Sequence, residues 1–151
     1  MNSTPNTIPT LNDDGLLPPG LFPCSFEELR SRFGVFRRSD QRVRLATELQ
    51  KYLQELRETG FVTRILIDGS FVTSKDEPND IDLIIVLQAH HDFSSTLKPH
   101  HYNTLSKRRV LKTHGFDILL APEGSATLNE YIDFFQKTRE GRSKGLLEVR
   151  P

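Results

Sequence analysis

Two short stretches, Ile67-Asp68-Gly69-Ser70 and Asp80-Ile81-Asp82-Leu83, decide the interpretation of this chain. The first ends an apolar run in a Gly-Ser turn, and the second opens another apolar run with two carboxylates. Short apolar runs rich in β-branched residues are typical of strands that are buried on both faces. Residues 63–67 and 81–87 are therefore predicted to be buried strands joined by a polar loop.

The rest of the chain predicts a small mixed β-sheet flanked by helices, which is an α/β (α+β) fold. Ser25 and Glu28 form a capping box that begins a short helix, and Gly34 ends it. A longer helix is expected to end at Gly60, where a left-handed glycine stops it. The other expected elements are a helix around 102–111, a buried strand at 116–121, a helix from 125 or 127 to 136, and a short edge strand at 145–149.

Length and composition favour one domain that needs no disulfide. We expect residues 1–14 to be a disordered tip and 15–151 to be a single domain with an N-terminal Pro-rich arm. Cys24 is the sole cysteine, which excludes an internal disulfide and a Cys-rich zinc site. No secretory signal and no membrane span is recognisable, so a cytoplasmic protein is expected.

The formal net charge is zero, with 20 Lys and Arg against 20 Asp and Glu. Any anion site must therefore be local. One candidate is the segment from Lys98 to His114, which holds five Lys or Arg residues and no acid. It is either an exposed helix face or a surface that attracts a triphosphate or a nucleic acid. The paired histidines, His90-His91 and His100-His101, are expected in surface loops. His114 is the histidine expected to reach the rim of the site.

Asp80 and Asp82 are two residues apart at the head of a strand, so their side chains are expected on one face. Two carboxylates beside an apolar strand repel each other and lose hydration, unless a cation neutralises them. Mg²⁺ is the usual cation where phosphates supply further ligands. The pair thus predicts a magnesium site.

Asp117 is a third acid within an apolar strand and is followed by Ile118-Leu119-Leu120. On a strand adjacent to the first pair it would complete a site for two ions about 3.5 to 4 Å apart. Asp68 is open to two interpretations, because an aspartate there also serves to cap the turn after a strand.

The turn and the loop offer contacts for phosphate. A glycine after a strand lets backbone amides and a hydroxyl approach a triphosphate closely, which fits Gly69 and Ser70. Lys75 in the loop is a candidate cationic contact, or a solvated loop residue.

Gly69-Ser70, nine intervening residues, Asp80-Ile81-Asp82-Leu83 and a later Asp117 together resemble the signature of the DNA polymerase β-like nucleotidyltransferase superfamily. The resemblance covers about residues 60–121, and the wider chain is similar to a bacterial group in that superfamily. It implies that the turn holds nucleotide phosphates, that the paired acids bind two Mg²⁺ ions and that the third acid helps activate the attacking hydroxyl.

The small relatives implied by this resemblance are minimal nucleotidyltransferases, often antitoxins that transfer AMP to a partner toxin. They follow Gly-Ser with an aromatic residue and Ala-Arg-Gly, whereas this chain has Phe71-Val72-Thr73-Ser74-Lys75. The resemblance implies that the missing arginine contributes to phosphate affinity and to modification of a partner.

We therefore expect a Mg²⁺-dependent nucleotidyltransferase that moves a nucleoside monophosphate from an NTP, with ATP favoured, to a hydroxyl on a protein or RNA acceptor. The alternative is an interaction module that keeps the fold but is catalytically weak, such as an antitoxin or a defence accessory protein. A metal-dependent nuclease is a third and weaker interpretation, since clustered acids also serve there.

Overall fold

The structure is a computed structural model that describes residues 8–89 and 99–151. In chain order its elements are β1 (Leu21–Pro23), α1 (Phe26–Phe33), α2 (Gln41–Thr59), β2 (Val62–Asp68), the 3-10 turn η1 (Ser70–Val72), β3 (Asp82–Leu87), α3 (Pro99–Leu105), α4 (Lys107–His114), β4 (Asp117–Pro122), α5 (Ala126–Phe135) and β5 (Leu146–Val149).

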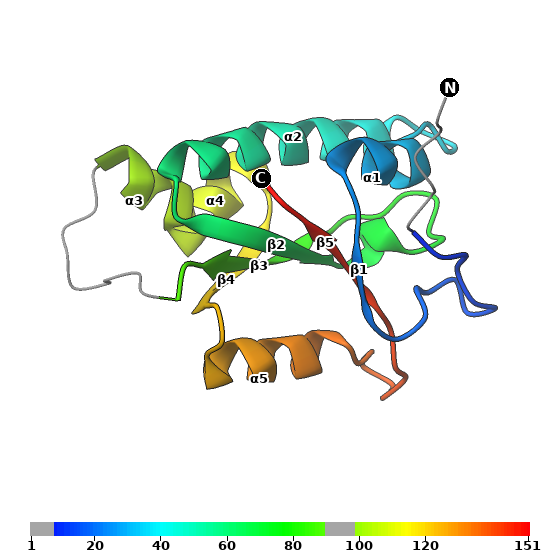
Figure 1. Cartoon of the computed structure of the whole chain (residues 1–151). Coiled ribbons are helices and arrows are strands. Elements are labelled where there is room, and N and C mark those ends of the chain that lie inside the picture. Colours follow the sequence, from blue (N-terminus) through cyan, green and yellow to red (C-terminus); the bar gives the residue numbers. More distant parts are fainter. Residues whose placement is uncertain (1–7, 90–98) are drawn as a thin grey trace, which may run out of the picture.

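The strands form one five-stranded mixed sheet in the order β1-β5-β2-β3-β4. β2 is antiparallel to both of its neighbours, β3 and β5, while β4 runs parallel to β3 and β1 parallel to β5. Helices α1 to α4 lie on one side of the sheet and α5 lies on the other (Figure 1). The predicted mixed sheet flanked by helices is confirmed.

Local sequence signals place most helix ends. Ser25 and Glu28 form the expected capping box of α1, and Gly60 ends α2 with a positive φ of 77°. Ser125 caps α5 by accepting a hydrogen bond from the backbone N–H of Leu128. The prediction of a single helix around 102–111 is wrong. α3 ends at Leu105, and Ser106 caps a separate helix, α4.

The alternation of side chains along the central strands divides the core into two layers. Leu66 and Ile84 belong to the apolar cluster that packs against α5, whereas Ile67 and Leu83 belong to the larger cluster under α1 and α2. Asp68 and Asp82 are two residues from Leu66 and Ile84 along their strands, so both carboxylates lie on the α5 side of the sheet.

Two termini of the fold differ from the sequence-based expectation. The closing stretch is not an edge strand, because β5 lies between β1 and β2, and the edge is formed by the β1 part of the expected arm. Of the expected disordered tip, residues 1–7 lie outside the described residues, whereas Ile8 is only 3% exposed. The carbonyls of Ile8 and Pro9 accept hydrogen bonds from Arg32. Among residues 8–89 and 99–151, no helix has the length and apolar character needed to cross a bilayer.

Candidate active site

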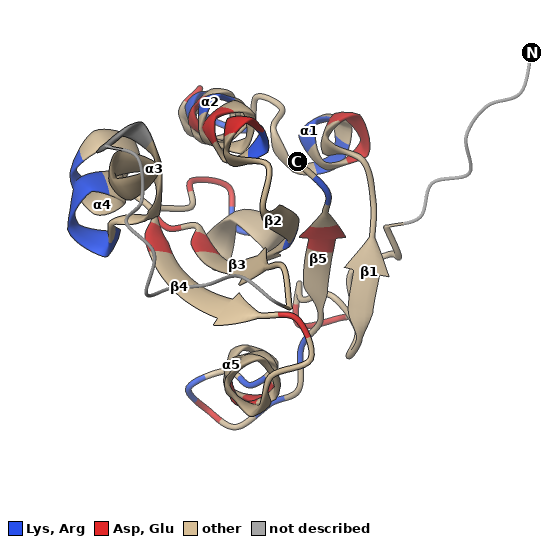
Figure 2. Cartoon of the chain, turned by 60° about the vertical axis from the view of Figure 1, so that its left-hand side comes forward, with Lys and Arg blue, Asp and Glu red and all other residues tan. Residues whose placement is uncertain are grey.

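Three aspartates lie side by side across three neighbouring strands. Asp68 at the end of β2 pairs with Asp82 at the start of β3, and Asp82 pairs with Asp117 at the start of β4. Paired residues point to the same face of a sheet, and adjacent strands are about 4.8 Å apart. The three side chains therefore form a row on the α5 face, with Asp82 in the middle and the outer two about 10 Å apart. Figure 2 shows the acidic residues at which β3 and β4 begin.

The central carboxylate, Asp82, forms no ion pair with any described residue. Burial raises the pKa of Asp82 to about 6, and the negative charges of Asp80, Asp68 and Asp117 add to this effect, with Lys144 opposing it. No described residue donates a hydrogen bond to its carboxylate in this structure. Ionised Asp82 is therefore held under repulsion at neutral pH, and a cation beside it would relieve that repulsion.

Asp68 is buried, with 4% of its surface exposed, and is paired with Lys144. The Lys144 ammonium donates to Oδ2 at 3.0 Å and lies 2.8 Å from Oδ1. Oδ1 accepts no hydrogen bond of good geometry from any described residue, although it belongs to this ion pair. Burial raises the pKa of Asp68 and the lysine opposes the rise. The row thus has a cation at its β2 end.

The Gly-Ser turn holds Asp80 against the row. Gly69 has a φ of 99°, and a Cβ at this position would lie 2.7 Å from the carbonyl oxygen of Asp80, so only glycine fits. The Ser70 hydroxyl donates to Oδ1 of Asp80 and accepts from the backbone N–H groups of Asn79 at 3.2 Å and Asp80 at 3.3 Å. The backbone N–H of Ser70 also donates to Oδ1 of Asp80, at 3.2 Å. In this structure Ser70 therefore positions the Asp80 carboxylate.

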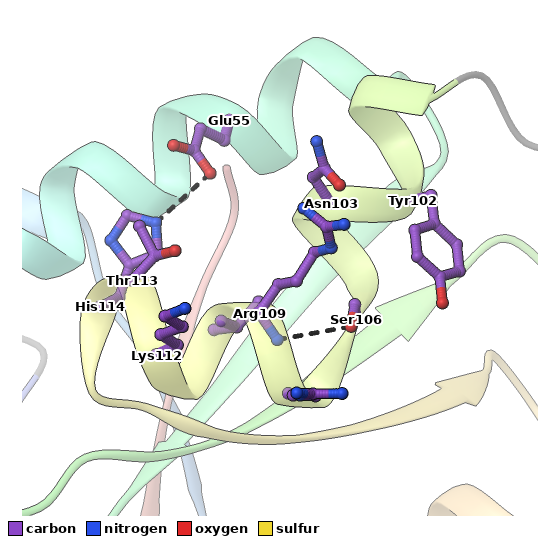
Figure 3. A pocket seen from close by; sticks show the side chains of 10 residues that line it. Glu55, Tyr102, Asn103, Ser106, Arg109, Lys112, Thr113 and His114 are labelled. Atoms are coloured by element: carbon purple, nitrogen blue, oxygen red, sulfur yellow. Dashed lines mark hydrogen bonds and ion pairs between the residues drawn. The ribbon is translucent and has the colours of Figure 1, made fainter.

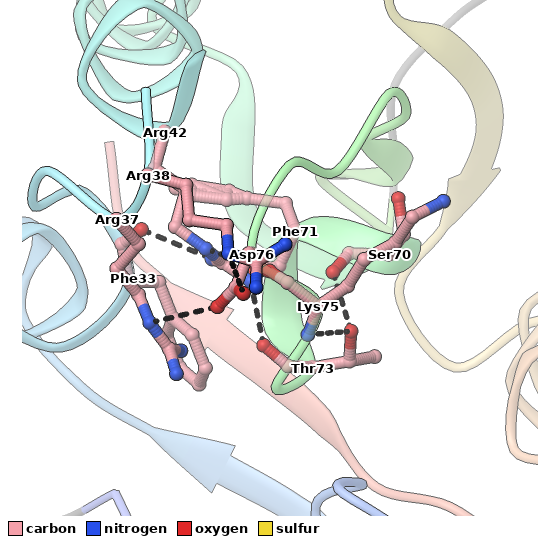
Figure 4. A network of polar contacts seen from close by, with 9 residues as sticks. All are labelled: Phe33, Arg37, Arg38, Arg42, Ser70, Phe71, Thr73, Lys75 and Asp76. Atoms are coloured by element: carbon pink, nitrogen blue, oxygen red, sulfur yellow. Dashed lines mark hydrogen bonds and ion pairs between the residues drawn. The ribbon is translucent and has the colours of Figure 1, made fainter. Parts of the chain in front are cut away.

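A buried arginine of α2 fixes the loop between the turn and the paired acids (Figure 4). The Arg42 side chain is 0% exposed and donates to the carbonyls of Phe33 at 3.0 Å, Phe71 at 2.7 Å and Thr73 at 2.7 Å. Its Nε donates to the carbonyl of Lys75 at 3.0 Å. Burial lowers the pKa of Arg42 to about 10, which leaves it charged at neutral pH. Four loop and helix carbonyls are thus satisfied by one guanidinium.

The acids face a cavity of about 810 Å³ whose opposite wall comes from the end of α5 and the segment after it. Phe134 on this wall is 73% exposed, an unusual position for a large apolar side chain. The lining residues are Asp68, Gly69, Ser70, Thr73, Asp80 and Asp82 on the sheet side, and Asp133, Phe134, Phe135, Lys137, Thr138, Arg139 and Lys144 on the other.

The structure brings together most of the residues that the sequence singled out. Gly69, Ser70, Asp80 and Asp82 all line the cavity. Asp117 completes the row but is exposed at the sheet edge and is not among the lining residues. Lys75 is exposed, lies outside the cavity lining and contributes its carbonyl to the Arg42 network.

The far wall was missed by sequence reasoning. Lys144 had no local signal, since its contact with Asp68 spans 76 residues. Phe134 gave no signal of its own beside Phe135, which takes the buried position. Arg42 likewise gave no local sign of burial. An arginine among alternating apolar and polar helix positions gives no sign that it points inward.

His114 does not reach the cavity, contrary to expectation. Its imidazole lies between α4 and α2, with Nδ1 2.9 Å from Glu48 and Nε2 3.4 Å from Glu55. Hydrogen bonding to His114 lowers the pKa of Glu48. His90 and His91 lie outside the described residues, whereas His100 and His101 belong to α3 and not to the expected surface loop.

A divalent ion is compatible with the chemistry of the paired acids. The described residues contain no group of three or more His, Cys, Asp and Glu placed to hold one ion. The spread of the row accounts for this, because Asp68 and Asp117 are two strands apart. Mg²⁺ is commonly bound through one or two carboxylates, with waters and substrate phosphates as the remaining ligands, and Asp80 with Asp82 fits that donor set.

Comparison with known families assigns the chain. The profile of a family of unknown function, DUF6932, matches residues 9–150. The chain belongs to the DUF6932 family. No curated protein and no solved structure matches it. The match extends from the arm that contains β1 to β5, so the DUF6932 unit includes the whole sheet and both walls of the cavity.

Proposed function

We propose that this DUF6932 protein is a Mg²⁺-dependent nucleotidyltransferase, which transfers a nucleoside monophosphate from an NTP, with ATP favoured, to a hydroxyl of an RNA or protein acceptor. The observation that carries the proposal is the row Asp68, Asp82 and Asp117 beside a cavity that also contains cations and an exposed aromatic ring. The resemblance of the turn and the acids to the DNA polymerase β-like superfamily points the same way.

Asp80 and Asp82 would hold the metal ion. Their geometry supports this role because Ser70 fixes Asp80 and Asp82 has no partner among the described residues. Asp82 and Asp117 are the residues that would hold a second ion. When bound, Mg²⁺ supplies positive charge that neutralises the triphosphate and the charge that develops on it during transfer.

The far wall of the cavity offers a site for the nucleotide. Lys137 and Arg139 are exposed cations on the lining, and Lys144 is close to the acids. Lys137 and Arg139 would contact phosphate oxygens and so replace the arginine missing from the Gly-Ser loop. The exposed ring of Phe134 suits stacking with a base. Asp133 on the same wall opposes phosphate binding nearby, which favours the phosphates on the side of Lys144.

The reaction would proceed by direct displacement. Asp117 accepts the proton of the acceptor hydroxyl, and the oxygen attacks the α-phosphorus of the NTP. The new oxygen–phosphorus bond forms as the bond between the α-phosphorus and its bridging oxygen to the β-phosphate breaks, and pyrophosphate leaves. Lys144 offsets part of the negative charge by remaining paired with Asp68. A contact between Ser70 and phosphate would require its hydrogen bond to Asp80 to be exchanged.

Labelling with each α-³²P NTP tests this function. The purified protein is incubated with Mg²⁺, one labelled NTP and a cell lysate, and the RNA and protein fractions are separated. We expect one fraction to acquire label, and Asp82→Asn to abolish the transfer. If no NTP raises the melting temperature at millimolar Mg²⁺ and no fraction is labelled, the proposal is wrong.

A second candidate is a partner-binding module on the same fold. It is favoured because two acids of the site already have partners within the chain. Asp80 accepts a hydrogen bond from Ser70, and Asp68 forms an ion pair with Lys144. In this case an Asp80→Ala and Asp82→Ala double variant would retain a stable complex and its cellular activity. Loss of that activity in the double variant would count against the second candidate.

A further inference from the structure

A second cavity of about 660 Å³ lies along α4, outside the carboxylate site (Figure 3). Arg108, Arg109 and Lys112 line it from α4, and all three are exposed. Tyr102 and Asn103 contribute from α3, and Tyr102 is 57% exposed. Cations and an exposed aromatic side chain thus share one concave surface, which we call the α4 cleft.

The positive charge of the α4 cleft is only partly balanced, because three cations and one acid, Glu55, line it. Between residues 99 and 114 the sequence has no Asp or Glu. The ion pairs found among the described residues include none from Lys107, Arg108, Arg109 or Lys112. Glu55 is the acid on the lining, and it is 3.4 Å from Nε2 of His114. An external anion would therefore find uncompensated cations.

Helix stability does not explain this arrangement. Lys107, Arg108 and Arg109 occupy the first turn of α4, where the helix macrodipole disfavours positive charge by a few tenths of a kcal/mol for each residue. The chain as a whole has no net charge, so the cluster is a local feature and not a consequence of a basic composition. A local cation cluster of this kind attracts polyanions.

The α4 cleft and the carboxylate row lie on opposite faces of the sheet, but α4 leads directly into β4, the edge strand at one end of the row. α4 ends at His114, three residues before Asp117, which is the exposed outer member of the row on the edge strand β4. Figure 2 shows the Lys and Arg positions of α4, in blue, near the end of the sheet where β4 begins. Lys144 and the far wall of the nucleotide cavity lie at the β2 end. Because β4 is the edge strand, RNA held in the α4 cleft would reach Asp117 around the edge of the sheet.

We propose that the α4 cleft binds single-stranded RNA and presents its hydroxyl to Asp117 as the acceptor. RNA binding stands on the cleft alone, whereas the acceptor role rests on the proposed function. Arg108, Arg109 and Lys112 contact the phosphate backbone, and Tyr102 stacks with a base. This combination of a basic groove with an aromatic platform is how proteins hold single strands without reading their sequence. An acidic polypeptide would use the cations but would leave Tyr102 without a stacking partner.

Fluorescence anisotropy with a 5′-labelled 20-nucleotide single-stranded RNA, without NTP or Mg²⁺, tests the proposal. The test variant is Arg108→Gln, Arg109→Gln and Lys112→Gln combined. The matched control is Arg30→Gln, Arg44→Gln and Lys51→Gln combined, which removes the same charge from exposed, ion-paired cations of α1 and α2. Circular dichroism melting of both variants shows that they are folded.

We expect the test variant to bind RNA at least tenfold more weakly and the control to change less than twofold. The slope of log K against log salt should fall by about 2 in the test variant, since each single-strand phosphate contact contributes about 0.7. Tyr102→Ala should weaken binding by about fivefold or more, because a stacking contact is lost, and leave the salt slope unchanged.

Equal RNA affinity of the test and control variants would overturn the proposal, as would tighter binding of a poly-glutamate peptide than of RNA. The outcome is separable from that of the proposed function. If Asp82→Asn keeps its RNA affinity and the wild type transfers no nucleotide, RNA binding stands and transfer does not. If nucleotide transfer occurs but the α4 cleft variants bind RNA as the control does, the cleft assignment alone is wrong.

Discussion

Replacement of Asp82 by asparagine should stabilise this protein at neutral pH while it removes the proposed metal ligand. Asparagine keeps the shape of the side chain and removes the charge that Asp80, Asp68 and Asp117 repel. No described residue donates a hydrogen bond to the Asp82 carboxylate, so the substitution breaks no known contact. Stabilisation by loss of an acid is expected where the acid is kept for function.

The magnitude follows from the shifted pKa. A rise from the ordinary value of 3.8 to about 6 corresponds to an upper limit of about 3 kcal/mol above pH 7. Asp82 is only partly buried, so solvent screening reduces the expected gain to about 1–2 kcal/mol. For a domain of this size that gain raises the melting temperature by roughly 2–8 °C.

The pH dependence has a definite sign. Because the folded pKa lies above the unfolded one, Asp82 makes its full favourable contribution to folding below about pH 3.8 and loses it as the pH rises through about 6. The difference in the free energy of unfolding between Asp82→Asn and the wild type should therefore be near zero at pH 4, grow up to pH 6 and become constant above about pH 7.

Urea denaturation across this pH range measures the difference. Asp13→Asn, which removes one charge from an exposed turn, is the control and should change the free energy of unfolding by less than about 0.5 kcal/mol. Destabilisation by Asp82→Asn at pH 7.5, or a difference that does not vary with pH, would refute the claim that the row stores repulsion.

Three further predictions concern the support of the site. Arg42→Met should lower the free energy of unfolding by about 3 kcal/mol or more, because buried carbonyls lose their hydrogen-bond donor. Urea denaturation measures this change, and a loss of under about 1 kcal/mol would contradict the prediction. Gly69→Ala should cost about 2 kcal/mol or more, since its Cβ meets the Asp80 carbonyl at a positive φ, and calorimetry would detect it. Phe134→Ala should weaken binding of a fluorescent ATP analogue about fivefold or more without changing the melting temperature. Phe36 is also exposed, at 67%, but lies outside the cavity, so Phe36→Ala should change neither. Equal affinities of the two variants would exclude Phe134 as a base platform.

Much of the local structure could be predicted because its causes are local. The capping box at Ser25, the left-handed Gly60 and the Ser125 cap each act within one turn of helix. The central strands were recognisable because strands buried on both faces are apolar without interruption. The helix break at Ser106 was missed. A serine within a basic amphipathic segment is as compatible with an exposed position inside a helix as with a helix end.

The candidate site was only partly visible in the sequence for a related reason. Asp80 and Asp82 are close in the chain, so strand geometry alone places them together. Asp68 acquires its meaning only from the antiparallel register that sets it beside Asp82, and a shift of one residue would have turned it to the other face. Lys144 and Phe134 come from segments that no local pattern connects to the acids.

The sequence by itself determined which charged residues lie within apolar strands and which turn requires glycine. It also determined which segment contains basic residues but no acidic ones. Tertiary structure alone decided that Asp68, Asp82 and Asp117 form one row and that α5 closes a cavity over part of it. It also decided that the closing strand lies inside the sheet. The physical reason is that strand order and register are fixed by pairing between distant segments and by burial of two apolar layers at once, which no short window of sequence specifies.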